Sequence, residues 1–389
     1  MTQDKPTIYF DNAATTYPKP EVVWQAMDEF ARLGGANANR GQNPMARRAA
    51  RMIDETRVKV AKWVGLPADG QITFAPSATI ALNQVILGSG LQPGDSVYVS
   101  PFEHNSTLRP LAHLQKTSGL KLQEIPFHPT RFEVAWDRLE VMWREASPAM
   151  LVLSQASNVC GLLLPVEELA ARARKANPSV TIAVDGAQAA GLYPLNLTIG
   201  LIDYLVWSGH KSFYGPFGVA GLAFCTDRRL QPIIFGGTGT ISESLEMPED
   251  LPYGLEAGSL NSPAIAGLSA ALDWLNQTGR ETITIHTAKL MKTLETELSD
   301  LYGLRLIKIP SDRRAPVLSL TAPGITPQAL EEYLGNQGIA VRAGLHCAPW
   351  AHRFLQTLGI GGTIRLSFGY FNHEEQIKYF VNSLAQIID

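Results

Sequence analysis

Between Gln71 and Gly209, short apolar runs alternate with longer stretches that have helical periodicity. The apolar runs are bounded by Gly, Pro or Ser and are typical of buried strands. They read QITFAP, DSVYVSP, Leu120–Phe127, AMLVLSQ, VTIAVDG and DYLVWSG. Because strands that alternate with helices form parallel sheets covered on both faces, this pattern predicts an α/β fold with a mostly parallel central sheet flanked by helices.

The two ends of the chain have a different pattern. Two helices are predicted early, over 21–34 and 45–64, and the segment from Phe235 to Ser262 is a Gly/Pro/Ser/Thr-rich loop or domain edge. Helices over 264–276 and 281–302, strands near 304–309 and 315–321 and a helix over 327–337 then predict an α+β unit. We expect a large domain over 16–263 and a smaller C-terminal domain over 264–389, which the N-terminal residues 1–15 join.

Composition limits the function classes. The 389 residues are 45% apolar and 18% charged, with a net charge of −3, as in ordinary globular proteins. This charge does not favour nucleic acid or an anionic membrane as a partner, and no apolar run approaches the ~20 residues of a membrane span. With no secretory signal pattern and only three scattered cysteines, we expect a reduced, cytoplasmic protein.

Lys211 follows the strand DYLVWSG, with Ser208 and His210 beside it. Ligands of open α/β sheets bind at the carboxyl ends of strands. A lysine that loses water there has a lowered pKa and becomes a nucleophile toward an aldehyde. The alternative is an ordinary surface lysine in a loop, and the other candidate residues of the chain bear on the choice between the two.

The segment Ser77-Ala78-Thr79 ends one strand and opens a helix. Free N–H groups at a helix start attract anions, although most Ser N-caps bind nothing. Ser208 and His210 would add donors one strand end away. The sequences GHKS and GPFGVAG match neither a P-loop nor a dinucleotide fingerprint.

Two further side chains follow predicted strands. Asp185, in VDGAQ, could cap a turn, bind a metal or hold the pyridinium N–H of a cofactor, and Gln188 could reach the same ligand. His104 follows DSVYVSP, where a histidine is either a hydrogen-bonded structural residue or a flat ring that stacks on an aromatic cofactor.

The segment VRAGLHCAPWAH and the later TIRLSFGYFN hold the remaining candidates. Cys347 lies in a glycine-bounded loop where Arg342 and His346 would favour its thiolate. A zinc site made by His346, Cys347 and His352 lacks a fourth ligand nearby, so we expect no metal. Arg365 could bind a carboxylate through two parallel N–H···O hydrogen bonds, or it could form a surface salt bridge.

Together these motifs resemble class V aminotransferases of the pyridoxal 5′-phosphate (PLP) fold-type I superfamily, and among them the group-II cysteine desulfurases and selenocysteine lyases. The resemblance runs from YFDNAATT to FNHEE. Its most specific parts are VDGAQ, SGHK followed by GP-x-G, and R-x-G-x-H-C-A, and the cysteine loop has the short form of group II.

For PLP, the resemblance implies that Lys211 carries the cofactor and that Asp185 pairs with its pyridine nitrogen. His104 would stack on the ring, and Gln188 and Asn158 would approach its phenolic oxygen. The phosphate cradle would be made by Ala78, Thr79, Ser208 and His210, with Ser259 reaching the phosphate of a neighbour in a homodimer.

For the substrate, the resemblance implies that Arg365 binds the carboxylate, with Arg342 and Asn158 nearby. Lys211 would take the Cα proton, and Cys347 would accept sulfur as a persulfide, while His104 or His346 shuttles a proton. L-Cysteine would become L-alanine, and an acceptor protein would receive the sulfur, for example in iron–sulfur cluster assembly.

Some positions depart from the family pattern: Asn39 replaces a usual His, Ala78 a Thr and Leu345 a polar residue, and one residue is added within Ser212-Phe213-Tyr214. The preference among cysteine, cystine and selenocysteine stays open. A PLP-dependent C–S lyase or selenocysteine lyase is the enzymatic alternative. A non-catalytic sulfur-relay or partner-binding protein on this scaffold is the alternative of another class.

Overall fold

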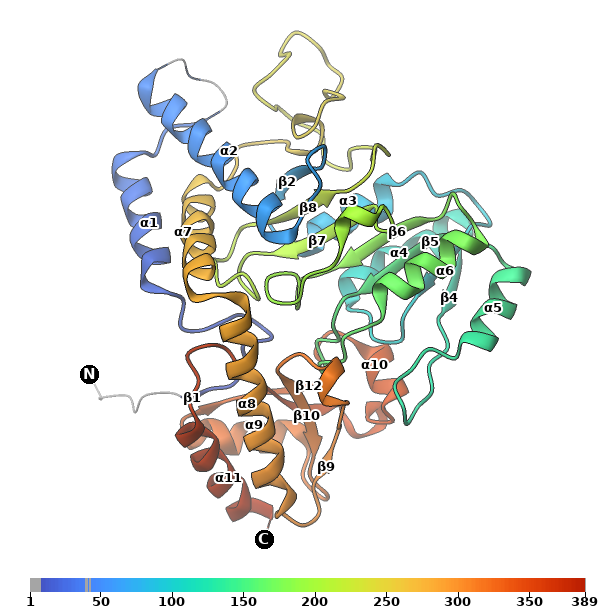
Figure 1. Ribbon diagram of the computed structural model, residues 1–389, viewed down its shortest axis with the longest axis vertical. Coiled ribbons are helices and arrows are strands. Elements are labelled where there is room, and N and C mark those ends of the chain that lie inside the picture. Colours follow the sequence, from blue (N-terminus) through green and yellow to red (C-terminus); the bar gives the residue numbers. More distant parts are fainter. Residues whose placement is uncertain (1–7, 39–40, 42, 389) are drawn as a thin grey trace.

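The computed structural model describes residues 8–38, 41 and 43–388 (Figure 1). A large unit with a wide sheet fills the upper part of the view, and a small unit lies below it. The long helix α8 (Arg280–Ser299) leads from one unit into the other. Among the described residues, no helix combines the length and apolar character that a membrane span requires.

The sheet of the large unit has seven strands in the order β2-β8-β7-β6-β5-β3-β4. Their bounds are β2 Gln71–Ala75, β3 Ser96–Val99, β4 Lys121–Glu124, β5 Pro148–Ser154, β6 Thr181–Asp185, β7 Tyr204–Ser208 and β8 Ala220–Phe224. Strands β3 to β7 pair in parallel, and β8 pairs antiparallel with both β7 and β2. The predicted α/β fold with a mostly parallel sheet is therefore confirmed.

Helices cover both faces of this sheet, because successive strand residues point to opposite sides. In β5, Leu151 and Leu153 enter one core and Met150 and Val152 enter the other. The helices of the large unit are α1 Glu21–Leu33, α2 Pro44–Val64, α3 Ala78–Gly88, α4 Asn105–Ser118, α5 Trp136–Glu145, α6 Val166–Ala176 and α7 Ser262–Thr278. The sequence analysis did not anticipate α5.

Two helix boundaries agree with the sequence signals. The predicted stop of α2 at Gly65 is a left-handed residue with φ 72°. Ser77 caps α3, since its hydroxyl accepts a hydrogen bond from the Ile80 amide at 3.3 Å.

The small unit has an antiparallel sheet in the order β12-β13-β10-β9 and a separate parallel pair, β1 with β11. The bounds of these strands and of the helices that follow α8 are β1 Ile8–Tyr9, β9 Arg305–Leu306, β10 Val317–Thr321, α9 Pro327–Asn336, β11 Ile339–Ala340, β12 Arg342–Gly344, α10 Pro349–Phe354, β13 Thr363–Ser367 and α11 Glu374–Ile388. Phe10 lies in the core of this unit, so the N-terminal segment packs with the C-terminal residues.

Helix α7 packs against α1 and α2, and Ile265, Leu268 and Leu272 enter the core of the large unit. The predicted boundary between 263 and 264 stays a prediction. We propose that the division lies at Gly279, between α7 and α8, because the side chains of α8 enter the core of the small unit.

Candidate active site

One pocket, here called the Lys211 pocket, lies at the carboxyl ends of β5, β6 and β7. Parallel neighbours end at the same sheet edge, which brings together residues far apart in the chain. The predicted residues that line it are Ala78, Thr79, His104, Asn158, Asp185, Gln188, Ser208, His210 and Lys211. Ser77, from the predicted anion-binding helix start, also lines it, as do Ser106 and Ser154, which were not predicted to bind a ligand there.

Lys211 lies three residues beyond the end of β7 and is largely buried. Burial lowers the pKa of its amine, an effect that the negative charge of Asp185 opposes. Its Nζ has no hydrogen bond or ion pair with any other residue that the structure describes. A largely buried amine with a lowered pKa is the form in which lysine attacks carbonyl carbon.

Asp185 is the last residue of β6 and is buried. Its Oδ1 accepts a hydrogen bond from the Ala187 amide at 2.9 Å. A carboxylate fixed at this depth can hold the N–H of a pyridinium ring. This geometry is compatible with a turn cap and with a partner of a pyridinium N–H, two of the roles that the sequence left open.

Asn158 and Gln188 both line the Lys211 pocket. The Asn158 amide donates to the His346 carbonyl at 2.6 Å, while its Oδ1 is buried and has no protein partner among the described residues. Gln188 donates from Nε2 to the Ala13 carbonyl at 2.9 Å. A buried polar atom without a partner is costly, so Asn158 Oδ1 fits a bound polar group.

His104 is the N-cap of α4. Its Nδ1 is held by the Ser106 amide at 3.0 Å and the Ser106 hydroxyl at 2.8 Å, which fixes the ring at the pocket wall. Burial, followed by the charge of Lys211, lowers its pKa. A neutral, fixed imidazole ring presents a flat face suited to stacking on an aromatic group.

The starts of α3 and α4 are tied together, because the Thr79 and Ser106 hydroxyls lie 2.9 Å apart. On the other side, the His210 ring stacks on Phe217 at 4.5 Å, and burial lowers its pKa to about 3. Its Nδ1 is buried without a partner among the residues described. The helix start and these polar groups form a site suited to a phosphate.

Cys347 is exposed and lies three residues after β12. Its carbonyl accepts a hydrogen bond from the Asn105 amide at 2.7 Å, so the loop docks beside His104. Both His346 and Cys347 have positive φ values, 48° and 57°, in a region that non-glycine residues adopt only where their surroundings enforce it. The thiol is close enough that its charge raises the pKa of Lys211.

One prediction about this loop is wrong. His346 was expected to supply positive charge, but burial lowers its pKa to about 2, so its ring is neutral. Its Nε2 lies 3.0 Å from the Thr363 hydroxyl. The other two cysteines, Cys160 and Cys225, have pKa values raised by burial, as their apolar settings predict.

Arg365 lies in the middle of β13 rather than at its start, and it is paired inside the protein. It donates to Asp11 Oδ1 at 2.6 Å and to the Asn158 carbonyl at 3.0 Å. Arg342 donates to Asp11 Oδ2 at 2.8 Å. The sequence analysis missed Asp11 because its arginine partners lie more than 300 positions away in the chain, although the carboxylate directly after a short strand was a visible signal.

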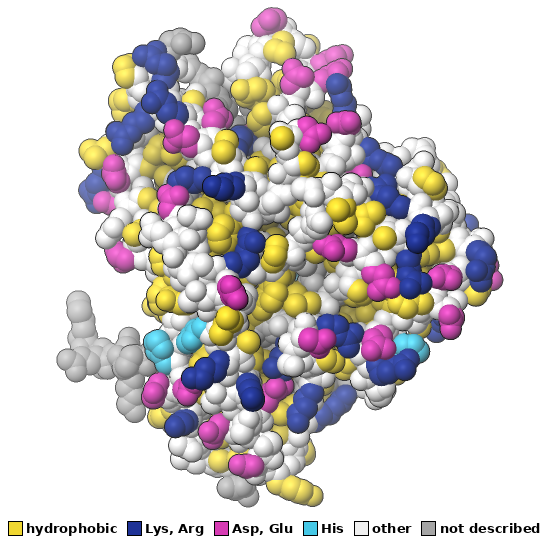
Figure 2. All heavy atoms as spheres, viewed as in Figure 1, with side chains coloured by type: hydrophobic (Ala, Val, Ile, Leu, Met, Phe, Trp, Pro, Cys, Tyr) yellow, Lys and Arg dark blue, Asp and Glu magenta, His cyan; other side chains and the backbone are white. Residues whose placement is uncertain are grey.

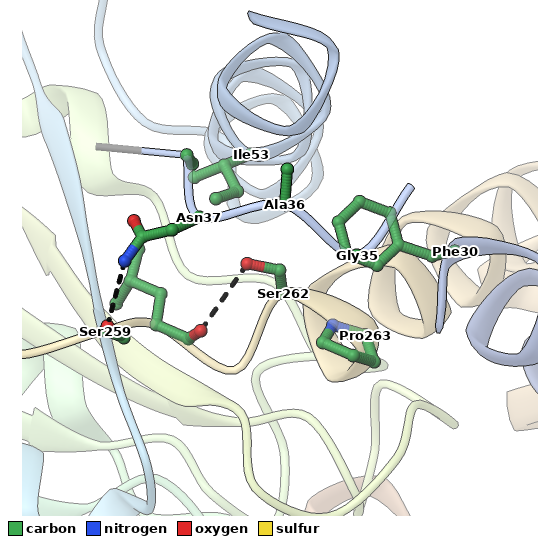
Figure 3. Close-up of a pocket in the computed structure, with 10 residues that line it drawn as sticks. Phe30, Gly35, Ala36, Asn37, Ile53, Ser259, Ser262 and Pro263 are labelled. Atoms are coloured by element: carbon green, nitrogen blue, oxygen red, sulfur yellow. Dashed lines mark hydrogen bonds between the residues drawn. The ribbon is translucent and has the colours of Figure 1, made fainter. Parts of the chain in front are cut away.

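Ser259 lies apart from the Lys211 pocket. It lines a second pocket with Phe30, Ile53 and Pro263, where its hydroxyl accepts a hydrogen bond from Asn37 at 3.3 Å (Figure 3). Asn39, where the family pattern has a His, lies outside the described residues. Ser259 therefore does not reach the site of its own chain, which is compatible with the predicted role toward a neighbour.

Comparison with known proteins gives consistent results. A "Probable cysteine desulfurase" of Vibrio cholerae is 31% identical over 100% of this chain and 95% of its own length. One of Mycolicibacterium paratuberculosis is 31% identical over 99% of this chain, which spans only 56% of that longer protein. The structure of a cysteine desulfurase from Thermococcus onnurineus superposes with a TM-score of 0.89 at 30% identity, covering 98% of this chain and 94% of the other.

The family profile described as "Aminotransferase class-V" matches residues 8–380, nearly the whole chain. This match and the structural neighbour confirm the fold-type I architecture and the resemblance drawn from VDGAQ, SGHK and the cysteine loop. The chain belongs to the class-V aminotransferase family.

Proposed function

We propose that this protein is a PLP-dependent cysteine desulfurase, which converts L-cysteine to L-alanine and takes up the sulfur on Cys347. The observation that carries the proposal is that Cys347 lies beside the Lys211 pocket, near enough for its charge to affect the pKa of Lys211, although the two residues come from different units. The hydrogen bond from the Asn105 amide to the Cys347 carbonyl holds the exposed thiol there. The family and the desulfurase relatives support the same reading.

The residues of the Lys211 pocket fit PLP. A buried carboxylate, a fixed imidazole, a lysine of lowered pKa and a helix start lie around one space, with unpartnered polar atoms on Asn158 and His210. In this proposal Lys211 holds the cofactor, Asp185 its ring nitrogen, and Thr79 and Ser208 its phosphate. When bound, PLP supplies an electron sink for the electrons left at the substrate Cα.

In this proposal, different side chains of the protein carry out the separate steps of the reaction. Lys211 Nζ, whose pKa is lowered by burial, accepts the Cα proton. Arg365 orients the substrate carboxylate. The Cys347 thiolate attacks the substrate sulfur, so that an S–S bond forms and the substrate C–S bond breaks. The electron pair of that bond and a proton go to Cβ, and Lys211 returns a proton to Cα, so that the three-carbon fragment leaves as alanine while Cys347 keeps the sulfur as a persulfide.

Product analysis with L-cysteine and the purified holoenzyme tests this proposal. We expect alanine in the wild type, with extra sulfur on the peptide that contains Cys347 after one turnover, detected by mass spectrometry. Cys347→Ala should bind PLP and lose alanine formation, whereas Cys160→Ala and Cys225→Ala serve as matched controls and should retain it. Pyruvate with ammonia as products, or sulfide release by Cys347→Ala at the wild-type rate, would instead establish a C–S or selenocysteine lyase.

We also propose that the protein works in the cytoplasm as a homodimer and passes its sulfur to an acceptor protein. Apolar side chains on the surface support a subunit contact: Trp24 is 45% and Leu33 64% exposed on α1. Apolar surface interrupts the charged side chains over α1 and the start of α2 (Figure 2). Such surface on a protein that is otherwise well packed marks an interaction site.

A further inference from the structure

Arg342 and Arg365 are direct cross-strand partners on the antiparallel pair β12 and β13. Like charges in this position destabilise a sheet. Asp11, from the segment after β1, bridges them with one carboxylate oxygen on each arginine, at 2.8 and 2.6 Å. The backbone of Asp11 is itself bridged to Ser367 of β13, so the N-terminal segment brings this carboxylate to a defined place.

Asp11, Arg342 and Arg365 form a charged cluster. Burial of two of its members makes the balance of charges within it energetically important. Arg365 is 2% and Asp11 5% exposed, and a buried charge without a partner is strongly unfavourable. Arg342 is half exposed, and the negative charge of Glu331 also acts on it.

Two titratable neighbours of the cluster, Tyr9 and His346, carry no charge near neutral pH. The pKa of Tyr9 is raised to about 12 by burial and by Asp11, and His346 is neutral. Asp11, Arg342 and Arg365 together therefore contain two cations and one anion, of which Arg365 and Asp11 are buried.

This cluster faces the Lys211 pocket. The positive charge of Arg365 lowers the pKa of both Lys211 and His104, and Arg365 holds the backbone of Asn158, which lines that pocket. Arg365 Nε is buried and has no partner among the described residues. The single net positive charge balances one carboxylate of a bound amino acid. A second carboxylate would compete with Asp11 for the two arginines of the cluster and would be repelled by it.

We propose that Asp11 is a specificity-determining residue, which sets the charge of the carboxylate subsite and selects amino acids with one carboxylate over acidic ones. This inference rests on the proposed function, because it assumes that an amino acid binds at Arg365. Asp11 acts through the two arginines and takes no part in the bond-breaking steps.

The test is equilibrium binding of L-alanine and of L-aspartate to the holoenzyme by titration calorimetry, which needs no turnover. The wild type should prefer L-alanine. Asp11→Asn removes the anion and leaves two cations, so the ratio of L-aspartate to L-alanine affinity should rise about tenfold or more. Thermal unfolding of each variant checks that the chain is folded.

The matched control is the double variant Asp11→Asn/Arg342→Gln, which returns the net charge to that of Arg365 alone. It should restore the wild-type preference, a rescue that a merely structural role of Asp11 does not predict. The inference is overturned if the ratio is unchanged in Asp11→Asn, if both affinities fall equally in both variants, or if the wild type binds neither amino acid. Alanine formation from L-cysteine is measured separately. If only the desulfurase proposal is wrong, the protein will bind the amino acids as expected but will form no alanine.

Discussion

Glu103 immediately precedes His104 and is completely buried at the carboxyl end of β3. Its Oε1 accepts hydrogen bonds from the Ser100 hydroxyl at 2.6 Å and the Ser154 amide at 2.8 Å, and its Oε2 accepts one from the Ser154 hydroxyl at 2.7 Å. Burial nevertheless raises its pKa from 4.5 to about 7. Glu103 thus links the strand end that carries His104 to the neighbouring strand end.

This raised pKa predicts a pH-dependent stability. Between pH 4.5 and about 7 the folded protein keeps a proton that the unfolded chain releases, so the free energy of unfolding falls as pH rises. Glu103→Gln removes this titration, and its amide can keep the three contacts because the Ser154 hydroxyl can also accept. The free energy of unfolding of the variant, minus that of the wild type, should increase by roughly 3 kcal/mol as the pH rises from 4.5 to 7. Denaturant unfolding at several pH values measures it, and a pH-independent difference would contradict the shift.

The sequence was sufficient to predict that the candidate residues after strands lie close together, because parallel strands end at one edge of a sheet, and these residues line one pocket in the structure. It could not predict which charges pair across the fold. Asp11 meets Arg365 only because β1 and β13 belong to the same unit, and His346 loses its charge only because neighbouring elements bury it.

At the scale of secondary-structure elements, strong periodicity gave reliable predictions. The strands β2 to β7 and helices α2, α3 and α9 appear close to their expected limits. The helices α5, α10 and α11 were not anticipated. The antiparallel direction of β8 was also not visible in its apolar run, because it follows from the short connection through Lys211, which leaves no room for a crossover helix.

A glycine contact between β12 and the start of β13 fixes the origin of the cysteine loop. Gly362 has φ 103°, and a Cβ there would lie 2.1 Å from the Gly344 carbonyl oxygen. Gly362→Ala should therefore displace the end of β12, three residues before Cys347, while the Lys211 pocket stays intact. We expect PLP binding to persist, measured by cofactor absorbance, and alanine formation to fall roughly 100-fold, since catalysis is sensitive to displacements of about 1 Å.

Gly359→Ala is the matched control, because a Cβ at Gly359 meets nothing within 4 Å. It should behave as wild type in both assays. Equal activity of the two variants would show that the position of the loop does not depend on the contact between Gly362 and Gly344.

At the scale of the whole molecule, we propose that the site is built between the two units and between two chains. The large unit supplies the strand ends and the helix starts, and the small unit supplies Arg365 and Cys347. Ser259 lies in the loop that precedes α7 and lines a separate pocket, so its predicted contact with a phosphate requires a second copy of the chain.

We therefore predict that the active protein sediments at twice the 42.4 kDa of one chain. Ser259→Asp can keep the hydrogen bond from Asn37, but it adds a negative charge where the neighbour's phosphate would bind. Its affinity for PLP, measured by fluorescence titration of the cofactor-free protein, should fall about tenfold or more. Ser244→Asp, at an exposed serine earlier in the same loop, is the charge-matched control and should retain wild-type affinity. A fully active monomer, or equal PLP affinity in the two variants, would refute a site shared between chains.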